Sequence, residues 1–196
     1  MKRILIALLA SAGLTLAMPG HASVVGFDNL DAGGKLSSIS KYNPYLDLTW
    51  DKNWFLGDTS VGGYSNGAHS GREFVSNGFG VNNLSVSSAT AFNFTGAWFA
   101  TPATNGAHAS WIDITAYDAS NNVIGTTGNV AINGTYSWVA ANFAGVSHLT
   151  ITRDKGWFVM DDFTLASPVP EPGSLPLMGL GLAALGLLRR RFRAAG

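Results

Sequence analysis

Short runs in which hydrophobic and polar residues alternate dominate the chain between residues 23 and 167. In one of them Ile112, Ile114 and Ala116 alternate with Asp113 and Thr115, so one face of an extended segment would be apolar and the other polar and solvent-facing. No stretch of this region carries the apolar stripe of an amphipathic helix. We therefore expect strands at residues 23–27, 46–50, 54–56, 84–86, 91–94, 112–116, 123–124, 130–132, 136–143, 149–152 and 157–165.

Many short strands separated by glycine and asparagine turns are typical of an antiparallel β-sandwich. The sequence thus predicts an all-β domain over residues 23–167, a jelly-roll-like sandwich of about eight to ten strands. Asn-Gly pairs at 66–67, 77–78, 105–106 and 133–134 are expected to supply the positive φ of tight hairpins. The polar run 118–122 is expected to turn the chain into the strand at 123–124.

The last expected strand contains two adjacent carboxylates, Asp161 and Asp162. Strict alternation would place Asp161 on the same face as Phe163, where a buried carboxylate needs a hydrogen-bonding partner. The alternative register keeps Phe158, Met160 and Phe163 inward and requires a β-bulge at the two aspartates. Both registers make this pair a special position.

Composition limits what the domain can be. Residues 23–167 hold six lysine and arginine residues against eleven aspartate and glutamate residues, so the net charge is −5 and nucleic acid is not expected as a partner. The chain has no cysteine, which excludes disulfides and a thiol nucleophile. About 145 residues suffice for one domain with its own core.

The N-terminal residues 1–22 have the form of a secretory signal peptide. Lys2 and Arg3 precede an apolar run at 4–12, and small residues follow up to Ala22. We expect a signal helix here, with cleavage after Ala22.

The C-terminus has three parts. Residues 168–173 form a proline-rich linker that contains Pro170, Glu171 and Pro172. Residues 174–188 are uncharged and are expected to form a short transmembrane helix, brief for the ~30 Å hydrocarbon core of a bilayer. Residues 189–196 are rich in arginine, and these side chains are expected to stop the helix on the cytoplasmic side. They are Arg189, Arg190, Arg191 and Arg193.

This order of Pro-Glu-Pro, short apolar helix and terminal arginine cluster resembles the PEP-CTERM sorting signal of Gram-negative, exopolysaccharide-producing bacteria. The resemblance implies that an exosortase, a membrane-embedded protease-transpeptidase, recognises Pro170, Glu171 and Pro172 and removes the tail. The domain would then be exported across the inner membrane, held transiently by its C-terminal helix, and released or attached at the cell surface. The alternative is an ordinary C-terminal membrane anchor.

A second resemblance rests on the ends of the domain. The opening Phe27-Asp28 and the closing apolar run with Asp161 and Asp162 look like jelly rolls of carbohydrate-binding-module and galactose-binding type. The resemblance implies neighbouring first and last strands, and carboxylates near them that hold structural calcium.

The candidate ligands for a structural calcium ion are Asp28, Asp31, Asp161 and Asp162, because hard cations prefer oxygen ligands. The alternative is that these carboxylates accept backbone hydrogen bonds or face solvent. His69 and His108, each after an Asn-Gly-Ala segment, are weaker candidates for zinc or iron. Glu73 is the only glutamate of the domain, so a glycosidase would have to pair it with an aspartate.

Five aromatic residues between 41 and 64 are the candidates for sugar binding, because flat rings in loops can stack on sugar faces. They are Tyr42, Tyr45, Trp50, Trp54 and Tyr64. The alternative is that these rings cap the open ends of the sandwich. We expect a non-enzymatic, structural or adhesive protein of the exopolysaccharide matrix or biofilm that binds polysaccharide. The alternatives are an extracellular carbohydrate-active enzyme and a metal-dependent binding protein.

Overall fold

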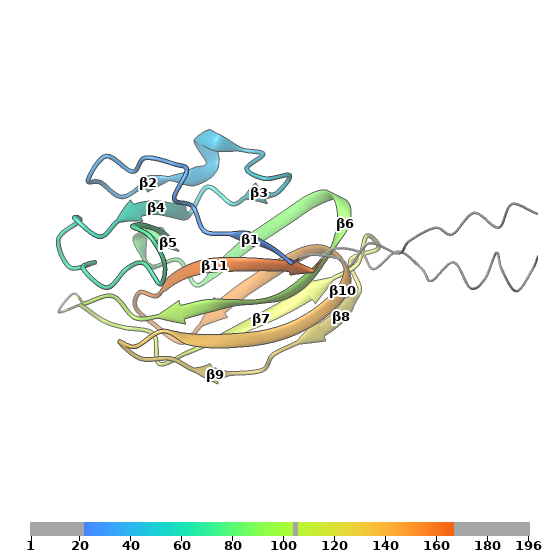
Figure 1. Cartoon of the computed structure of the whole chain (residues 1–196). Coiled ribbons are helices and arrows are strands. Elements are labelled where there is room, and N and C mark those ends of the chain that lie inside the picture. The colour runs from blue at the N-terminus through green and yellow to red at the C-terminus, as the bar shows by residue number, and fades with distance from the viewer. Residues whose placement is uncertain (1–21, 104–105, 167–196) are drawn as a thin grey trace, which may run out of the picture. The chain divides into compact units, whose positions relative to one another are not determined.

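The computed structural model describes residues 22–103 and 106–166, and residues 21–168 form one compact unit. Within the described residues the regular structure is eleven strands and two short 3-10 helices, which confirms the all-β prediction (Figure 1). The elements are β1 (Ser23–Val25), β2 (Ser37–Ser38), η1 (Ile39–Tyr42), β3 (Thr49–Trp50), β4 (Trp54–Asp58), β5 (Glu73–Asn77), η2 (Gly78–Gly80), β6 (Asn83–Ala100), β7 (Trp111–Tyr117), β8 (Val123–Thr126), β9 (Val130–Ala131), β10 (Ser137–Arg153) and β11 (Val159–Ala166).

The predicted signal helix, the Pro-Glu-Pro linker, the transmembrane helix and the arginine tail lie outside the described residues. Across the part of the chain that is described, no helix has the length and apolar character needed to cross a membrane.

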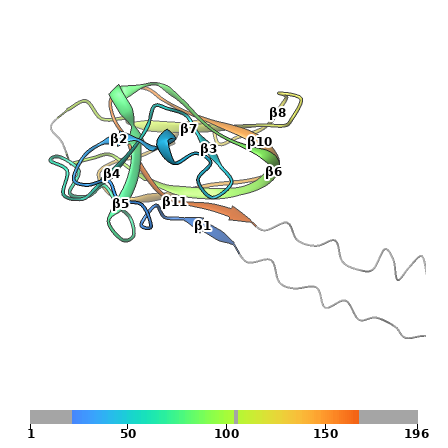
Figure 2. The same ribbon diagram turned by 90° about the horizontal axis from the view of Figure 1, so that it is seen from above.

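One antiparallel sheet folds over itself to make the two layers of the sandwich (Figures 1 and 2). Its central pair is β6 and β10, which run together from Ser137 opposite Phe99 to Thr152 opposite Asn83. The ladder between them shifts register several times between Ala140 and His148, where the pair bends. Strand β11, with β5, β4 and β2 beyond it, extends one half of this pair, and β7 and β8 extend the other half.

The space between the two layers is filled by a single large apolar cluster. Its centre is Trp50, which makes edge contacts with the rings of Phe27, Trp54 and Phe163. Strand β7 contributes aliphatic residues at every second position, such as Ile114. With no disulfide available, this packing supplies the cohesion of the domain.

The last strand adopts the bulged register. Phe158, Met160 and Phe163 all lie in the main core, and the pairing of β11 with β6 shifts between Asp161 and Thr164. At this bulge β11 also changes its other neighbour, from β5 to β1. Strand β1 therefore lies beside β11, as expected for the first and last strands (Figure 2).

The bulge turns Asp161 into the interior on the side away from the main core, where its side chain is 0% exposed. Its Oδ2 accepts hydrogen bonds from the backbone N–H groups of His69 (2.9 Å) and Ser70 (3.0 Å). Burial raises the pKa of Asp161 to about 7, against the lowering effect of the Ser70 donor and with added repulsion from Asp162. Asp161 thus fastens the long β4–β5 loop, residues 59–72, over the sheet.

Three strand predictions need correction. Of the run 46–50 only Thr49 and Trp50 form a strand, because Leu46 and Asp47 have positive φ. The separate runs 84–86 and 91–94 are parts of the single strand β6, and 137–143 and 149–152 are both within β10. Polar residues at the bend, such as Ser88 and Thr90, interrupt the alternation without ending the strand. Strand β5 was not predicted, whereas the hairpin between β7 and β8 at 118–122 is confirmed.

The expectation of positive-φ hairpins at the Asn-Gly pairs is wrong at 66–67, 77–78 and 133–134, where neither residue has positive φ. The asparagine amides instead tie loops together. Asn66 Nδ2 donates to the carbonyls of Thr101 (3.0 Å) and Gly134 (3.1 Å). Gly67 allows close approach, because a Cβ there would lie 2.3 Å from the Phe74 ring.

Replacing Gly67 by alanine should destabilise the domain by about 1–3 kcal/mol, because Phe74 is buried and has no room to move. Gly134→Ala is the matched control, since a Cβ there meets nothing within 4 Å. It should be neutral or stabilising by up to ~1 kcal/mol. Urea unfolding of both variants checks the difference, and equal effects would contradict the packing described here.

The raised pKa of Asp161 predicts a pH-dependent stability. Between its ordinary value of 3.8 and about 7, only the folded state holds this proton, so the free energy of unfolding falls as pH rises through that window. Asp161→Asn removes the titration and should make the slope shallower by up to about 1.4 kcal/mol per pH unit. Urea titrations at several pH values measure it. Asp47→Asn, at an exposed position, is the control, and an unchanged slope in Asp161→Asn would refute the assignment.

Candidate functional site

Two tryptophans lie side by side on the outer face of the long strand pair. Trp98 of β6 is directly opposite Trp138 of β10, and their ring centroids are 5.7 Å apart at an interplanar angle of 61°. Their neighbours Ala97 and Val139 belong to the core, so alternation turns both indoles outward. Trp138 is 36% exposed and Trp98 is half-buried.

His69 extends this aromatic surface. Its ring stacks on Trp98 with centroids 4.0 Å apart and an interplanar angle of 11°, and the Tyr136 ring meets it edge-on at 5.4 Å. His69 Nδ1 lies 2.7 Å from Asp162 Oδ2, which fixes the rotation of the imidazole. We call Trp98, Trp138, His69 and Tyr136 the aromatic row.

The loop that carries His69 is held at both ends of its contact with the sheet. The Tyr136 hydroxyl donates to the Gly67 carbonyl, and burial together with Asp161 and Asp162 raises the pKa of this tyrosine, which keeps it a donor. Ser70 Oγ donates to Asp162 Oδ1 at 2.7 Å. The aromatic row is therefore preorganised, and its exposed ring edges and faces suit stacking against a flat apolar surface such as one face of a sugar.

The five aromatic residues predicted to bind sugar are not available for it, with one exception. Four are core residues, and their exposed fractions are 6% for Tyr45, 1% for Trp50, 0% for Trp54 and 7% for Tyr64. That prediction is wrong for these four, because the sandwich closes over their rings. Tyr42 is half-buried and packs at the edge of the core, with the Lys41 ammonium 4.8 Å from its ring centroid.

Three of the four aspartates considered for calcium, Asp28, Asp161 and Asp162, contact the same segment, residues 69–73, whereas Asp31 bonds within its own turn. Asp28 Oδ1 accepts from the N–H groups of Arg72 (2.7 Å) and Glu73 (3.1 Å), and Asp31 Oδ1 accepts from Gly33 N at 2.8 Å. Asp161 and Asp162 are engaged by the 59–72 loop. Among residues 22–103 and 106–166 no group of three or more histidine or acidic side chains is placed to hold a metal ion, and calcium binding by these aspartates stays a prediction.

Glu73 and the two histidines considered for chemistry belong to different parts of the domain. Glu73 of β5 is paired in register with the buried Asp58 of β4, and burial followed by repulsion from Asp58 raises the pKa of Glu73. The pKa of Asp58 is lowered by its hydrogen bond from Ser60. His108 lies elsewhere, bridged to Trp157 at the rim of a pocket, while His69 belongs to the aromatic row.

Trp98 and Trp138 were missed because the sequence was searched for aromatic rings in loops. A usable signal was present within the strands themselves. Each tryptophan is out of phase with neighbouring core residues, which are Ala97 and Phe99 around Trp98 and Val139 after Trp138. A large ring on the polar phase of a half-buried strand indicates a surface with a purpose other than core packing.

Comparison with protein families gives one match, and it concerns the tail. Residues 168–191 match the PEP-CTERM protein-sorting motif. The predicted sorting signal is confirmed, and with it the assignment as an exported protein sorted at the Gram-negative cell envelope. None of the curated proteins matches the chain in sequence.

Several solved structures resemble the domain in fold. The N-terminal CBM22-1-CBM22-2 tandem domain of Paenibacillus barcinonensis Xyn10C is 10% identical, with a TM-score of 0.47 over 80% of this chain and 48% of that chain. A DUF4465 family protein from Bacteroides caccae is 11% identical, with a TM-score of 0.45 over 81% and 97%. TmCBM61 in complex with β-1,4-galactotriose is 15% identical, with a TM-score of 0.34 over 73% and 94%. The chain spans about half the length of the tandem structure.

Proposed function

We propose that this chain is a non-enzymatic surface protein of the Gram-negative envelope that is processed by an exosortase and binds carbohydrate through the aromatic row. Its role would be structural or adhesive within the extracellular polysaccharide. The single observation that carries the binding proposal is the outward-facing cross-strand pair of Trp98 and Trp138 with His69 stacked upon it.

Three features of the row support recognition of a sugar rather than of an apolar partner. The indoles offer a ring surface that is only partly exposed, too small to bury a hydrophobic helix. Polar groups adjoin it, since the His69 imidazole stacks on Trp98 and its Nδ1 contacts Asp162. Sugar rings combine an apolar face with hydroxyls at the rim, so a stacked ring could exchange hydrogen bonds with these side chains.

The pairing of the first and last strands of the domain is compatible with surface attachment. Ser23 of β1 pairs with Leu165 of β11, so these two strands lie side by side (Figure 2). Either a retained or a removed tail leaves the paired core strands intact, because all residues of the two core clusters lie between Val25 and Leu165.

Trp138→Ala should weaken binding to a glycan that the wild-type domain retains by at least tenfold, which corresponds to about 1.4 kcal/mol. Screening on a glycan array followed by calorimetric titration measures the loss. Trp138→Phe keeps a ring and should retain part of the affinity. Phe79→Ala removes an aromatic side chain that is 84% exposed in η2, outside the row, and should change nothing. Unaltered affinity in Trp138→Ala would refute the proposed site.

Glu171→Gln should block removal of the tail, because Glu171 is the only charge between the two prolines that the sorting motif presents to the protease. Intact mass of the exported protein checks this. The wild type should lack Arg189 to Arg193, and the variant should keep them. Lys155→Gln, a charge change within the domain, should mature normally, and equal masses for Glu171→Gln and wild type would contradict the processing proposal.

A further inference from the structure

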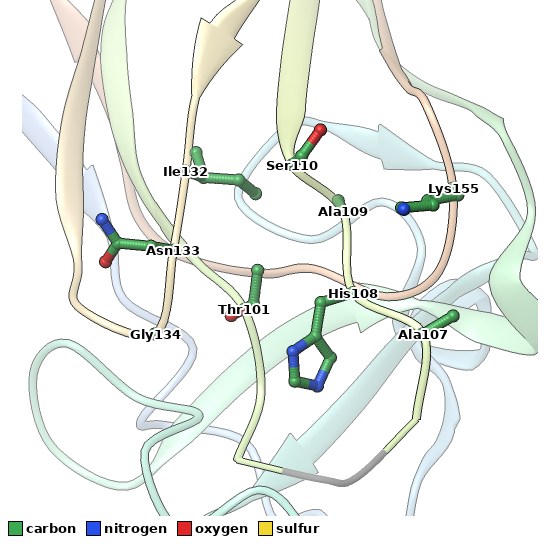
Figure 3. A pocket seen from close by; sticks show the side chains of 9 residues that line it. All are labelled: Thr101, Ala107, His108, Ala109, Ser110, Ile132, Asn133, Gly134 and Lys155. Atoms are coloured by element: carbon green, nitrogen blue, oxygen red, sulfur yellow. The ribbon is translucent and has the colours of Figure 1, made fainter.

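A separate pocket lies at the end of the domain where β6 finishes and β7 and β10 begin (Figure 3). Its volume is about 510 Å³, within the range of roughly 300–1,000 Å³ common for small-molecule sites. Four segments far apart in the sequence form its walls, namely Thr101, residues 107–110, residues 132–134 and Lys155. No function described above uses this cavity.

The wall that carries His108 is held in place by backbone hydrogen bonds. Trp157 N–H donates to the Ala107 carbonyl (2.9 Å), and Ala109 N–H donates to the Trp157 carbonyl (3.1 Å), so His108 is clamped between two bonds to one residue. The close approach depends on Gly156, whose φ is +65° and where a Cβ would lie 2.0 Å from the Ala107 carbonyl oxygen. This side of the pocket is therefore formed before any ligand arrives.

The lining of the pocket is cationic although the domain as a whole is acidic. Lys155 is the one charged side chain in the lining, and none of the nine lining residues is acidic. The nearest carboxylate in sequence, Asp154, is occupied by Ser110, which donates through its N–H (2.9 Å) and its hydroxyl (2.6 Å). Within the described part of the chain no carboxylate pairs with Lys155, so its ammonium is available to an external anion.

Figure 3 shows the Lys155 side chain pointing toward Ala109, with Thr101 and the His108 ring lower in the same view. The Lys155 ammonium and the Thr101 hydroxyl are donors suited to a carboxylate, and the charge-assisted hydrogen bond from Lys155 would be the stronger of the two.

From this lining we infer that the pocket is a subsite for the carboxylate of an acidic sugar residue, which names the class of polysaccharide that the proposed aromatic row would bind. The inference rests on that proposed function. Thr101 follows Trp98 by three residues along extended chain, a separation of roughly 10 Å, and Gly134 precedes Trp138 by four residues. Asn66 bridges Thr101 and Gly134 between the two sites, so one polysaccharide chain could contact both.

The test uses the exported protein, obtained by expression of the full chain, and a matched pair of probes. The probes are polygalacturonate oligomers and the same oligomers after reduction of their carboxylates to primary alcohols. The wild type should bind the acidic form roughly tenfold more tightly, because one charge-assisted contact distinguishes the two. This preference should shrink when the salt concentration rises from 0.15 to 0.5 M.

Lys155→Gln should abolish the preference while leaving the affinity for the reduced oligomer unchanged. Lys35→Gln, which removes the same charge at an exposed position outside the pocket, should keep the preference. Matching melting temperatures of the two variants establish that both are folded. A preference that survives Lys155→Gln, or equal binding of both probes by the wild type, would overturn the inference.

The outcomes separate this inference from the function on which it rests. If Trp138→Ala abolishes binding of both probes but Lys155→Gln alters nothing, the aromatic row binds the polysaccharide and the inference of an acidic-sugar subsite is wrong. If the preference for the acidic probe depends on Lys155 but binding does not depend on Trp138, the pocket is the acidic-sugar subsite and the proposal that the aromatic row binds carbohydrate is wrong. A wild-type protein that binds neither these probes nor any array glycan would refute both.

Discussion

The structure depends on one buried carboxylate at a break in the last strand. Asp161 occupies the bulge where β11 exchanges β5 for β1, and it fills that gap by accepting two N–H groups from the 59–72 loop. The bulge returns Phe163 to the main core. The hydrogen bonds place His69 directly over Trp98. A single departure from regular pairing therefore determines both how the sandwich closes and how its outer surface is arranged, at the cost of burying an ionisable group.

The paired strands β6 and β10 contribute side chains both to the core and to the outer surface. Alternation sends Ala97, Phe99 and Val139 into the core, and the same period presents Trp98 and Trp138 to the outside. The core packing thus makes the outer surface rigid, because an indole on the outer face cannot shift without moving a strand whose inner face is packed in the core. Binding to such a surface loses little conformational entropy, which is the condition under which a few rings can give useful affinity.

Much of this fold could be predicted from sequence, and the limits have physical causes. The alternation in 112–116 and the spacing of apolar residues on either side of the two aspartates are local signals. Strand β7 and the bulge in β11 could therefore be predicted. Whether Trp50 and Trp54 are buried depends on how the two layers pack together, and no local sequence pattern reports that packing. The prediction that they belong to a binding site failed for this reason. The Asn-Gly pairs misled because Asn66 and Asn77 use their amides for contacts distant in sequence, which outweigh the turn preference.

The aromatic row is formed without the residues that match the sorting motif. The pairing of Ser23 with Leu165 places β1 and β11 side by side, away from the strand that carries Trp138. The aromatic row is built from β6, β10 and the 59–72 loop, none of which includes a residue of the tail. Since the contacts that shape the row all lie between Asn66 and Asp162, the domain can present the same surface before and after its tail is cut. Attachment would then change where the protein acts and leave unchanged what it contacts.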